Sequence, residues 1–365
     1  NTLELSSAAS DVYKRQARNR IYGWIDDQVD PSGPQGDLVA FTIAEGAAVN
    51  DIATDLANAG IINNATVFRY WLRCEGDITI TGFLGCDNEV SFQAGDYELF
   101  ENMSYASAVE ILDDGPIPEV YYTVTIPEGL RLTEVITRLA EENDRFDEQQ
   151  IVEALGNPAL RSEYLPDDIS PFLWFEGMLF PATYDIPETD IADEARFIQR
   201  LSEEFDSRFT ALLETQGRDP VIDELGLTDY QIIVIASLIE EEAKTDEDRP
   251  KMARAIYNRL LAGDLLGIDA STDYAVNKSF TEGLTADDLA FESPYNTRAV
   301  RGIPPTPIAA PGEASLLAAL QPSSDTSLYY WARTDEGGVV GAHSFAATAE
   351  GHAANVEVCR ELGYC

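Results

Sequence analysis

The sequence predicts an α+β fold, with two small strand-turn-helix units followed by a larger, helix-rich region. Residues 41–60 (FTIAEGAAVNDIATDLANAG) and 124–143 (VTIPEGLRLTEVITRLAEEN) match at five positions, and each reads as a strand, a turn and an amphipathic helix. From about residue 191 onward, long helical patterns alternate with loops rich in proline and glycine. Hydrophobic residues make up 45% of the chain, which is ample for packed cores.

The first 37 residues are treated apart from the fold. Residues 6–16 (SSAASDVYKRQ) read as the translation of a sequencing-library adaptor, so residues 1–16 are expected to be foreign to the natural protein. Residues 17–37 are expected to be a linker. On this interpretation the natural N-terminus, with any signal or membrane anchor, is missing. No apolar run approaches the roughly 20 residues of a membrane helix.

The two strand-turn-helix units have the same turn chemistry. Gly46 and Gly129 follow an acidic residue at the point where the chain must leave the strand, and glycine adopts the backbone angles that such turns require. Asn50 and Thr133 come next and are expected to cap the N-termini of the two helices.

The chain is strongly acidic. It carries 65 Asp and Glu residues against 24 Lys and Arg, a formal net charge of -41. Proteins that bind nucleic acid along its phosphate backbone need a basic face. The large excess of acidic residues therefore excludes this class of nucleic-acid-binding protein. We interpret the acidity as a solvated surface rather than as a functional patch.

Four cysteines fall into two local pairs, Cys74 with Cys86 and Cys359 with Cys365. Such pairs indicate disulfides formed in an oxidising compartment, and four unrelated thiols are the alternative. Neither pair has the C-x-x-C spacing of a zinc site, and the chain has two histidines. We therefore expect no metal and no other cofactor.

Three adjacent glutamates end an apolar helical segment in ASLIEEEAKTDEDRP. If the helix follows an N-cap at Thr228 and continues past Ala243, Glu242 falls within the apolar face at about 100° per residue. On the same wheel Glu241 points the opposite way and Glu240 lies between. A carboxyl among apolar neighbours has a raised pKa, as a general acid near neutral pH requires. The pattern favours Glu242, and a frayed helix end with all three glutamates exposed is the alternative.

The segments after residue 38 resemble one known family. They include EGMLFPATYDIP, ASLIEEEA, EDRP, AIYNRL, DAST with Tyr274, SPYNT, GIPPTPIAAPGEASLLAALQP, YYW and GAHSF. On these motifs the chain is similar to the endolytic murein transglycosylases of the YceG-like family, also called MltG. The strand-turn-helix repeat resembles the LysM-like module at that family's N-terminus.

The resemblance implies an enzyme that cuts peptidoglycan glycan strands internally, near sites of new synthesis. Such enzymes cleave the MurNAc–GlcNAc bond without water and leave 1,6-anhydroMurNAc ends. The family's catalytic glutamate is the second of an E-x-E pair followed by Thr or Ala, which is Glu242 here. The resemblance also implies a location at the extracytoplasmic face of the cytoplasmic membrane, with an N-terminal anchor in that membrane. The expected substrate is the glycan strand, and the candidate protein partners are peptidoglycan synthases.

The pattern and the resemblance together predict the domain organisation. After the linker come a LysM-like module at 38–115, a second strand-helix unit and connector at 116–165, and a catalytic domain with a glycan-binding groove at 166–365. Residues 74–86 are expected to be an insertion in the LysM-like module.

Further residues fall on family motifs and are expected to line the glycan groove: Asn258, Arg259, Tyr274, Tyr295 and Asn296. A structural role is the alternative for these residues. Asn258 and Arg259 could cap helices or hydrogen-bond between them, and Tyr295 could pack in the core.

Asp269 is expected to be structural or to orient the substrate, and it is the candidate second carboxylate if the enzyme uses water. His343 and His352 also fall on family positions, and we expect them to be structural hydrogen-bonding residues. The alternatives to a transglycosylase are a non-catalytic peptidoglycan-binding protein and a muramidase-type hydrolase with a second acid.

Three positions depart from the family pattern. The family's PDTY segment is PATY here, with Ala182 in place of the aspartate. Its PYNTY segment is PYNTR here, with Arg298 in place of the last tyrosine. Its DPT segment is DAS here, at residues 269–271. None of them is Glu242, so they bear on contacts with the substrate rather than on catalysis itself.

Overall fold

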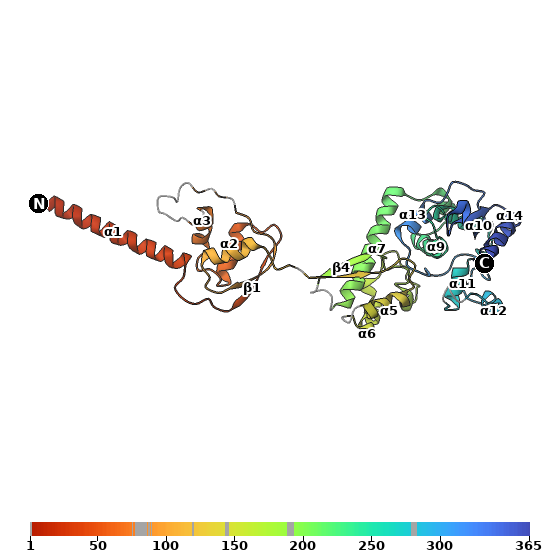
Figure 1. Ribbon diagram of the computed structural model, residues 1–365, viewed down its shortest axis with the longest axis horizontal. Helices are drawn as coiled ribbons and strands as arrows, with labels where there is room; N and C mark the ends of the chain where they lie inside the picture. The colour runs from red at the N-terminus through yellow and green to blue at the C-terminus, as the bar shows by residue number, and fades with distance from the viewer. Residues whose placement is uncertain are drawn as a thin grey trace. The chain divides into compact units, whose positions relative to one another are not determined.

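The computed structural model describes residues 2–74, 76, 86, 88, 90–118, 120–142, 146–187, 193–278 and 283–365. The chain divides into two compact units, Asn1–Glu119 and Val120–Cys365, and each is described by itself (Figure 1). Helices predominate among the described residues, together with small antiparallel sheets of two strands each. The α+β prediction is confirmed.

The first unit is built around one antiparallel sheet of two strands. Its elements are α1 (Thr2–Val29), β1 (Leu38–Ile43), α2 (Val49–Asn58), α3 (Ala65–Arg73), β2 (Gly95–Phe100) and α4 (Tyr105–Asp114). β1 pairs antiparallel with β2, with Leu38 opposite Phe100. Helix α1 covers most of residues 17–37, the segment expected to be a linker, and its end packs on α3. A core of buried aliphatic and aromatic side chains holds the unit together.

Both predicted glycine turns are present, whereas the predicted helix caps are wrong. Gly46 and Gly129 have φ of +74° and +78°, in the region that glycine enters without steric cost. Asn50 lies inside the first turn of α2, whose N-cap is Ala48, and Thr133 is the second residue of α5 (Leu132–Glu142). Each helix starts earlier than expected because the turn after the glycine is shorter than the predicted one.

The second unit begins with a sheet that joins distant segments. Its first elements are β3 (Tyr121–Thr125), α5, α6 (Glu148–Leu155), two 3-10 turns (Pro158–Leu160 and Pro171–Leu173), β4 (Thr183–Pro187) and α7 (Glu194–Gln216). β3 pairs antiparallel with β4, and residues of β3, α5, α6 and α7 share one core. Residues 120–165 therefore lie in the same compact unit as the segment predicted to be catalytic.

The rest of the unit surrounds one buried helix. The elements are α8 (Pro220–Glu224), α9 (Asp229–Glu242), α10 (Arg249–Ala262), α11 (Asp269–Ala275), α12 (Ala286–Leu289), α13 (Glu313–Leu320), β5 (Tyr330–Arg333), a 3-10 turn (Glu336–Gly338), β6 (His343–Ala346) and α14 (Ala349–Glu361). Figure 1 shows α9 grouped with α10 and α13, and these helices pack on one another. The apolar run of α9 is buried on all sides.

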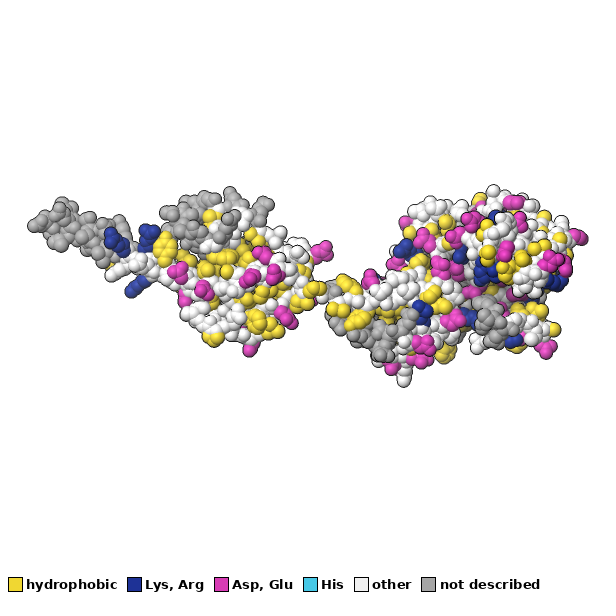
Figure 2. Space-filling model, viewed as in Figure 1, with side chains coloured by type: hydrophobic (Ala, Val, Ile, Leu, Met, Phe, Trp, Pro, Cys, Tyr) yellow, Lys and Arg dark blue, Asp and Glu magenta, His cyan; other side chains and the backbone are white. Residues whose placement is uncertain are grey.

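Both predicted disulfides are present, Cys74–Cys86 and Cys359–Cys365. Most residues between Cys74 and Cys86, and with them the predicted insertion, lie outside the described residues. None of the described helices combines the length and apolar character needed to cross a bilayer. Acidic side chains are spread over the faces of both units seen in Figure 2, as a net charge of -41 leads one to expect.

Candidate active site

Helix α9 brings the three glutamates to the centre of the second unit. Its start is the predicted one, because Thr228 caps the helix and forms a reciprocal capping box with Gln231. Its end comes before Ala243, whereas the prediction had the helix continuing past that residue. Ala243 is buried and extended, so Glu242 is the last helical residue.

Glu240 is a structural anchor. Its Oε1 lies 3.1 Å from Nη1 of Arg249 on α10, and its Oε2 accepts a 2.9 Å hydrogen bond from the backbone N–H of Gly312. The Glu240 and Arg249 side chains are 6% and 11% exposed. The pair ties α9 to α10 and to the loop before α13. Glu240 is therefore fully engaged in holding the unit together.

Glu241 faces the strand-turn-helix turn of the same unit. A side chain at Gly129 would come within 3.1 Å of its Oε1. Burial raises the pKa of the Glu241 carboxyl to about 8, and the charge of Lys244 opposes this rise. The helical wheel placed Glu241 opposite the apolar face, but the turn at Gly129 covers that side as well.

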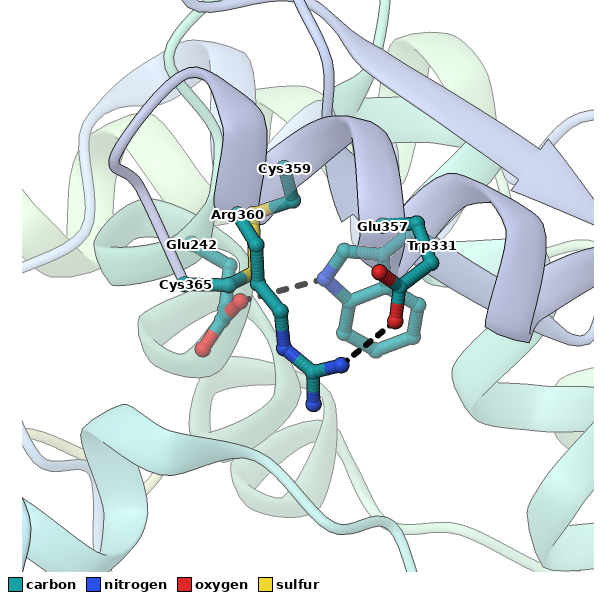
Figure 3. The surroundings of a disulfide bond; sticks show 6 residues. All are labelled: Glu242, Trp331, Glu357, Cys359, Arg360 and Cys365. Carbon is teal, nitrogen blue, oxygen red and sulfur yellow. Dashed lines mark hydrogen bonds and ion pairs between the residues drawn. A yellow bond between two sulfur atoms is a disulfide. The ribbon is translucent and has the colours of Figure 1, made fainter.

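Glu242 is held by two N–H donors. Trp331 on β5 donates from Nε1 to its Oε2 over 3.1 Å, and the backbone N–H of Ala270 on α11 also donates to the carboxylate. Burial raises the pKa of Glu242, whereas the two donors favour the ionised form and lower it. Figure 3 shows Glu242 and Trp331 in the surroundings of the Cys359–Cys365 disulfide. Burial and the two donors thus act on the pKa of this carboxyl in opposite directions, and burial is the larger effect.

Asp269 adjoins this carboxyl at the start of α11. It is the residue before Ala270, and its negative charge raises the pKa of Glu242. Its own carboxylate forms an ion pair with Arg298, the residue that replaces the family's tyrosine. The Asp269 side chain remains 57% exposed. It is accessible to a ligand and is already neutralised by a neighbour.

Tyr274 belongs to a network that the sequence did not reveal. Its hydroxyl donates to Oε2 of Glu176 over 2.9 Å, and its ring centroid lies 4.9 Å from that of Tyr295. Glu176 is buried, accepts a second hydrogen bond from the backbone of Leu132, and has its pKa raised by burial to about 7. The Tyr295 hydroxyl bonds to Thr306 over 2.9 Å. Both tyrosines are partly buried, so part of each ring remains accessible.

Asn258 and Asn296 form hydrogen bonds within the second unit. Asn258 donates to the carbonyls of Thr326 and Leu328, which fixes the loop before β5. Asn296 is fully buried, and its amide bonds the side chain of Thr272 and the carbonyls of Leu289 and Phe291. The structure does not place these two amides beside Glu242.

Arg259 supports the aromatic segment that holds Glu242. Its guanidinium donates to the carbonyls of Tyr329 and Leu266, and it lies 4.8 Å and 5.2 Å from the rings of Tyr330 and Trp331. Cation–π contacts of this kind restrict the aromatic rings. Arg259 therefore contacts the ring that donates to Glu242, and the charge of Glu242 in turn raises the pKa of Arg259 against the lowering by burial.

Sequence reasoning did not select two residues that contact the candidate site, Trp331 and Glu176. A signal existed for each. A buried indole N–H needs a hydrogen-bond acceptor, and a lone carboxyl in an apolar segment such as EGMLFP has a perturbed pKa once buried. Neither signal identifies the partner. Among the described residues, no cluster of three or more His, Cys, Asp or Glu side chains is arranged to hold a metal ion.

Comparison with known proteins places the chain in a family. The YceG-like family model matches residues 41–358. The endolytic murein transglycosylase of Bacillus subtilis (strain 168) is 29% identical over 310 residues, which cover 81% of this chain and 79% of that protein. The protein of the same name from Streptococcus pneumoniae serotype 2 is 28% identical over 341 residues, 87% of this chain and 58% of the relative.

A crystal structure of a yceG-like protein from Listeria monocytogenes superposes with a TM-score of 0.53 at 25% identity. The match covers 87% of this chain and 99% of that one. Since the family model spans most of the sequence, this chain belongs to the YceG-like family.

Proposed function

We propose that this chain is an endolytic murein transglycosylase that cuts the MurNAc–GlcNAc bond of peptidoglycan strands. The main support for this proposal is the environment of Glu242. Burial raises the pKa of its carboxyl, and two N–H donors hold the carboxyl in place. The names of the family's relatives support the same reaction class. One carboxyl suffices for this chemistry, because the nucleophile is part of the substrate.

The reaction follows from the two protonation states of Glu242. Protonated Glu242 gives its proton to the glycosidic oxygen as the bond from that oxygen to C1 of the muramic sugar breaks. The carboxylate then takes the proton of the muramic C6 hydroxyl, and the C6 oxygen bonds to C1. The ring closes as a 1,6-anhydro sugar and no water is consumed. Burial favours the acid form in the first half, and the donors from Trp331 and Ala270 stabilise the carboxylate formed by it.

The groove residues divide into two roles in this proposal. Asp269, Tyr274 and Tyr295 remain partly accessible and contact the glycan. Asn258, Arg259 and Asn296 position the segments around them. The hydrolase alternative would need Asp269 to direct a water molecule, but its pairing with Arg298 favours a role in substrate orientation.

The remaining expectations are part of the same proposal. Residues 38–115 form a LysM-like module that binds the glycan, and a groove in the second unit holds the strand at Glu242. The enzyme works at the outer face of the cytoplasmic membrane, held there by an N-terminal anchor, with peptidoglycan synthases as partners. The family's function supports these statements.

Digestion of purified glycan strands tests the function. Mass spectrometry of the new chain ends is expected to find 1,6-anhydroMurNAc. New reducing ends would support the hydrolase, and an absence of new ends would support a non-catalytic binding protein.

Replacing Trp331 with Phe is expected to shift the pH dependence of cleavage. Loss of the indole N–H removes a donor that favours the ionised form, so the pKa of Glu242 rises and the alkaline limb moves to higher pH. The maximal rate should fall by about 10- to 100-fold, since a hydrogen bond to a charged group contributes about 1.5–3 kcal/mol and about 1.4 kcal/mol is a factor of ten.

The matched control for this variant is Trp174→Phe. Its indole N–H donates to the carbonyl of Ile169, away from Glu242, so the pH profile should stay unchanged. An unshifted profile in Trp331→Phe would show that the indole does not tune the carboxyl.

A further inference from the structure

One buried carboxyl of the second unit takes no part in the reaction described above. Glu176 is 4% exposed and lies in the loop between the 3-10 turn at Pro171–Leu173 and β4. Each of its two oxygens accepts a hydrogen bond over 2.9 Å, Oε1 from the backbone N–H of Leu132 and Oε2 from the hydroxyl of Tyr274. These two bonds compensate for the burial of the carboxyl. Glu176 therefore joins two segments that are far apart in the sequence.

The first of these segments is the start of α5. Leu132 is the first residue of that helix, and the first N–H groups of a helix have no partner within it, so Glu176 caps α5 from outside. Arg131, the residue before, contacts the same region as Tyr274. Its guanidinium lies 5.4 Å from the Tyr274 ring centroid, and its Nη2 donates to the carbonyl of Lys278 over 2.9 Å. Glu176 and Arg131 thus fasten the start of α5 to the C-terminal end of α11.

The second segment, α11, shapes the environment of Glu242. Its second residue, Ala270, donates its backbone N–H to the Glu242 carboxylate, and the charge of Asp269 acts on the same carboxyl. The helix has only seven residues, and Tyr274 follows Ala270 by about one helical turn. A displacement of Tyr274 therefore moves the N–H that holds Glu242.

A different group holds the other end of α11. The hydroxyl oxygen of Thr297 accepts the backbone N–H of Ile268 over 2.9 Å and lies 2.8 Å from the hydroxyl oxygen of Ser271. An anchor at one end fixes the position of a short helix but leaves it free to tilt about that point. The bond from Tyr274 to Glu176 supplies the second anchor. Two anchors together set the direction in which α11 points.

We propose that Glu176 is a positioning residue for glycan cleavage: through Tyr274 it fixes the orientation of α11 and so directs the Ala270 N–H at Glu242. This inference rests on the proposed function, which assigns the proton transfers to Glu242. Glu176 transfers no proton to the sugar in this role, and the role depends on hydrogen-bond geometry rather than on charge. The start of α5 is then a support of the active site.

Two substitutions of Glu176 separate geometry from charge. In Glu176→Gln the amide oxygen still accepts the N–H of Leu132 and the amide NH₂ donates to the oxygen of Tyr274, so both contacts remain without a charge. In Glu176→Leu both contacts are lost. We expect the Gln variant to cleave within a few-fold of the unmodified chain. The Leu variant should cleave about 10- to 100-fold more slowly, as small misplacements of a catalytic group do.

The pH profile of cleavage shows whether Glu242 is affected. A less well-directed Ala270 N–H favours the carboxylate less, so the alkaline limb in Glu176→Leu should move upward by about one pH unit. Tyr274→Phe keeps the cap on α5 and the aromatic ring but removes the bond to Glu176, and it should shift the limb in the same direction. The double variant should add little, because both changes remove one interaction.

The matched control is Tyr184→Phe. The Tyr184 hydroxyl is also a donor in the second unit, to the carbonyl of Phe180 over 2.7 Å, but it does not contact α11 through that bond. Its loss should lower the temperature of unfolding and leave the pH profile unchanged.

A loss in Glu176→Gln as large as that in Glu176→Leu would show that Glu176 acts by its charge or its proton, and would overturn the proposal. An unshifted profile in Tyr274→Phe would also overturn it, whether or not Glu176→Leu folds. A second readout needs no cleavage, because the Trp331 indole donates to Glu242. The fluorescence of Trp331, taken as the difference between the unmodified chain and Trp331→Phe, follows the ionisation of Glu242.

The two readouts distinguish this inference from the function on which it rests. Cleavage to anhydro ends with the same titration of Glu242 in the unmodified chain and in Tyr274→Phe removes the role of Glu176 and leaves the function. A shifted titration in Tyr274→Phe, in a chain that cleaves no glycan, removes the function and supports Glu176 as the residue that positions α11 at Glu242.

Discussion

Replacing Glu242 with Gln is expected to reduce glycan cleavage on the order of 10³-fold, with the fold intact. The amide keeps the size of the carboxyl and still accepts the N–H of Trp331, so packing at the end of α9 is preserved. It can neither donate a proton to the glycosidic oxygen nor remove one from the muramic hydroxyl. Cleavage rates on purified strands measure the loss, and thermal unfolding checks the fold.

Two neighbouring glutamates provide matched controls. Glu241→Gln changes the adjacent carboxyl, which faces the turn at Gly129, and Glu247→Gln changes an exposed one in the same stretch. Both variants should retain cleavage within a few-fold of the unmodified chain. Loss of activity in Glu241→Gln with activity kept in Glu242→Gln would reassign the catalytic acid to its neighbour.

Replacing Arg249 with Ala is expected to destabilise the second unit by about 3–5 kcal/mol, the cost of leaving a buried charge without its partner. Glu240 would keep one hydrogen bond, from Gly312, but lose its counter-ion in a place where water has little access. Urea unfolding followed by tryptophan fluorescence measures the change.

The exposed pair Arg360–Glu357 is the control for this loss. Its side chains are 59% and 69% exposed, so Arg360→Ala should cost less than about 1 kcal/mol. If the two arginine variants were equally stable, Glu240 would not be the anchor that its contacts indicate.

The features that could be predicted from the sequence are those set by local chemistry. The capping box at Thr228, the positive φ at Gly46 and Gly129, and the two short-range disulfides follow from residues close together in the chain. The apolar run of α9 and the family motif independently favoured Glu242.

The features that could not be predicted are contacts across long stretches of chain. Trp331 is 89 residues from Glu242, and Tyr274 is 98 residues from Glu176. A helical wheel ranks the faces of α9 but does not show that the whole helix is enclosed, so it placed Glu240 in an intermediate position when it is a buried ion-pair partner. The amide of Asn296 could bind a sugar, but in the fold it is hydrogen-bonded to Thr272 and to the carbonyl of Leu289.

The most direct test of the single-carboxyl mechanism is digestion of purified glycan strands in H₂¹⁸O, followed by mass spectrometry of the new ends. Because the muramic C6 oxygen closes the ring, we expect 1,6-anhydroMurNAc ends that contain no heavy oxygen. New reducing ends carrying one heavy oxygen atom each would show that water attacks the sugar, and would rule out the single-carboxyl mechanism.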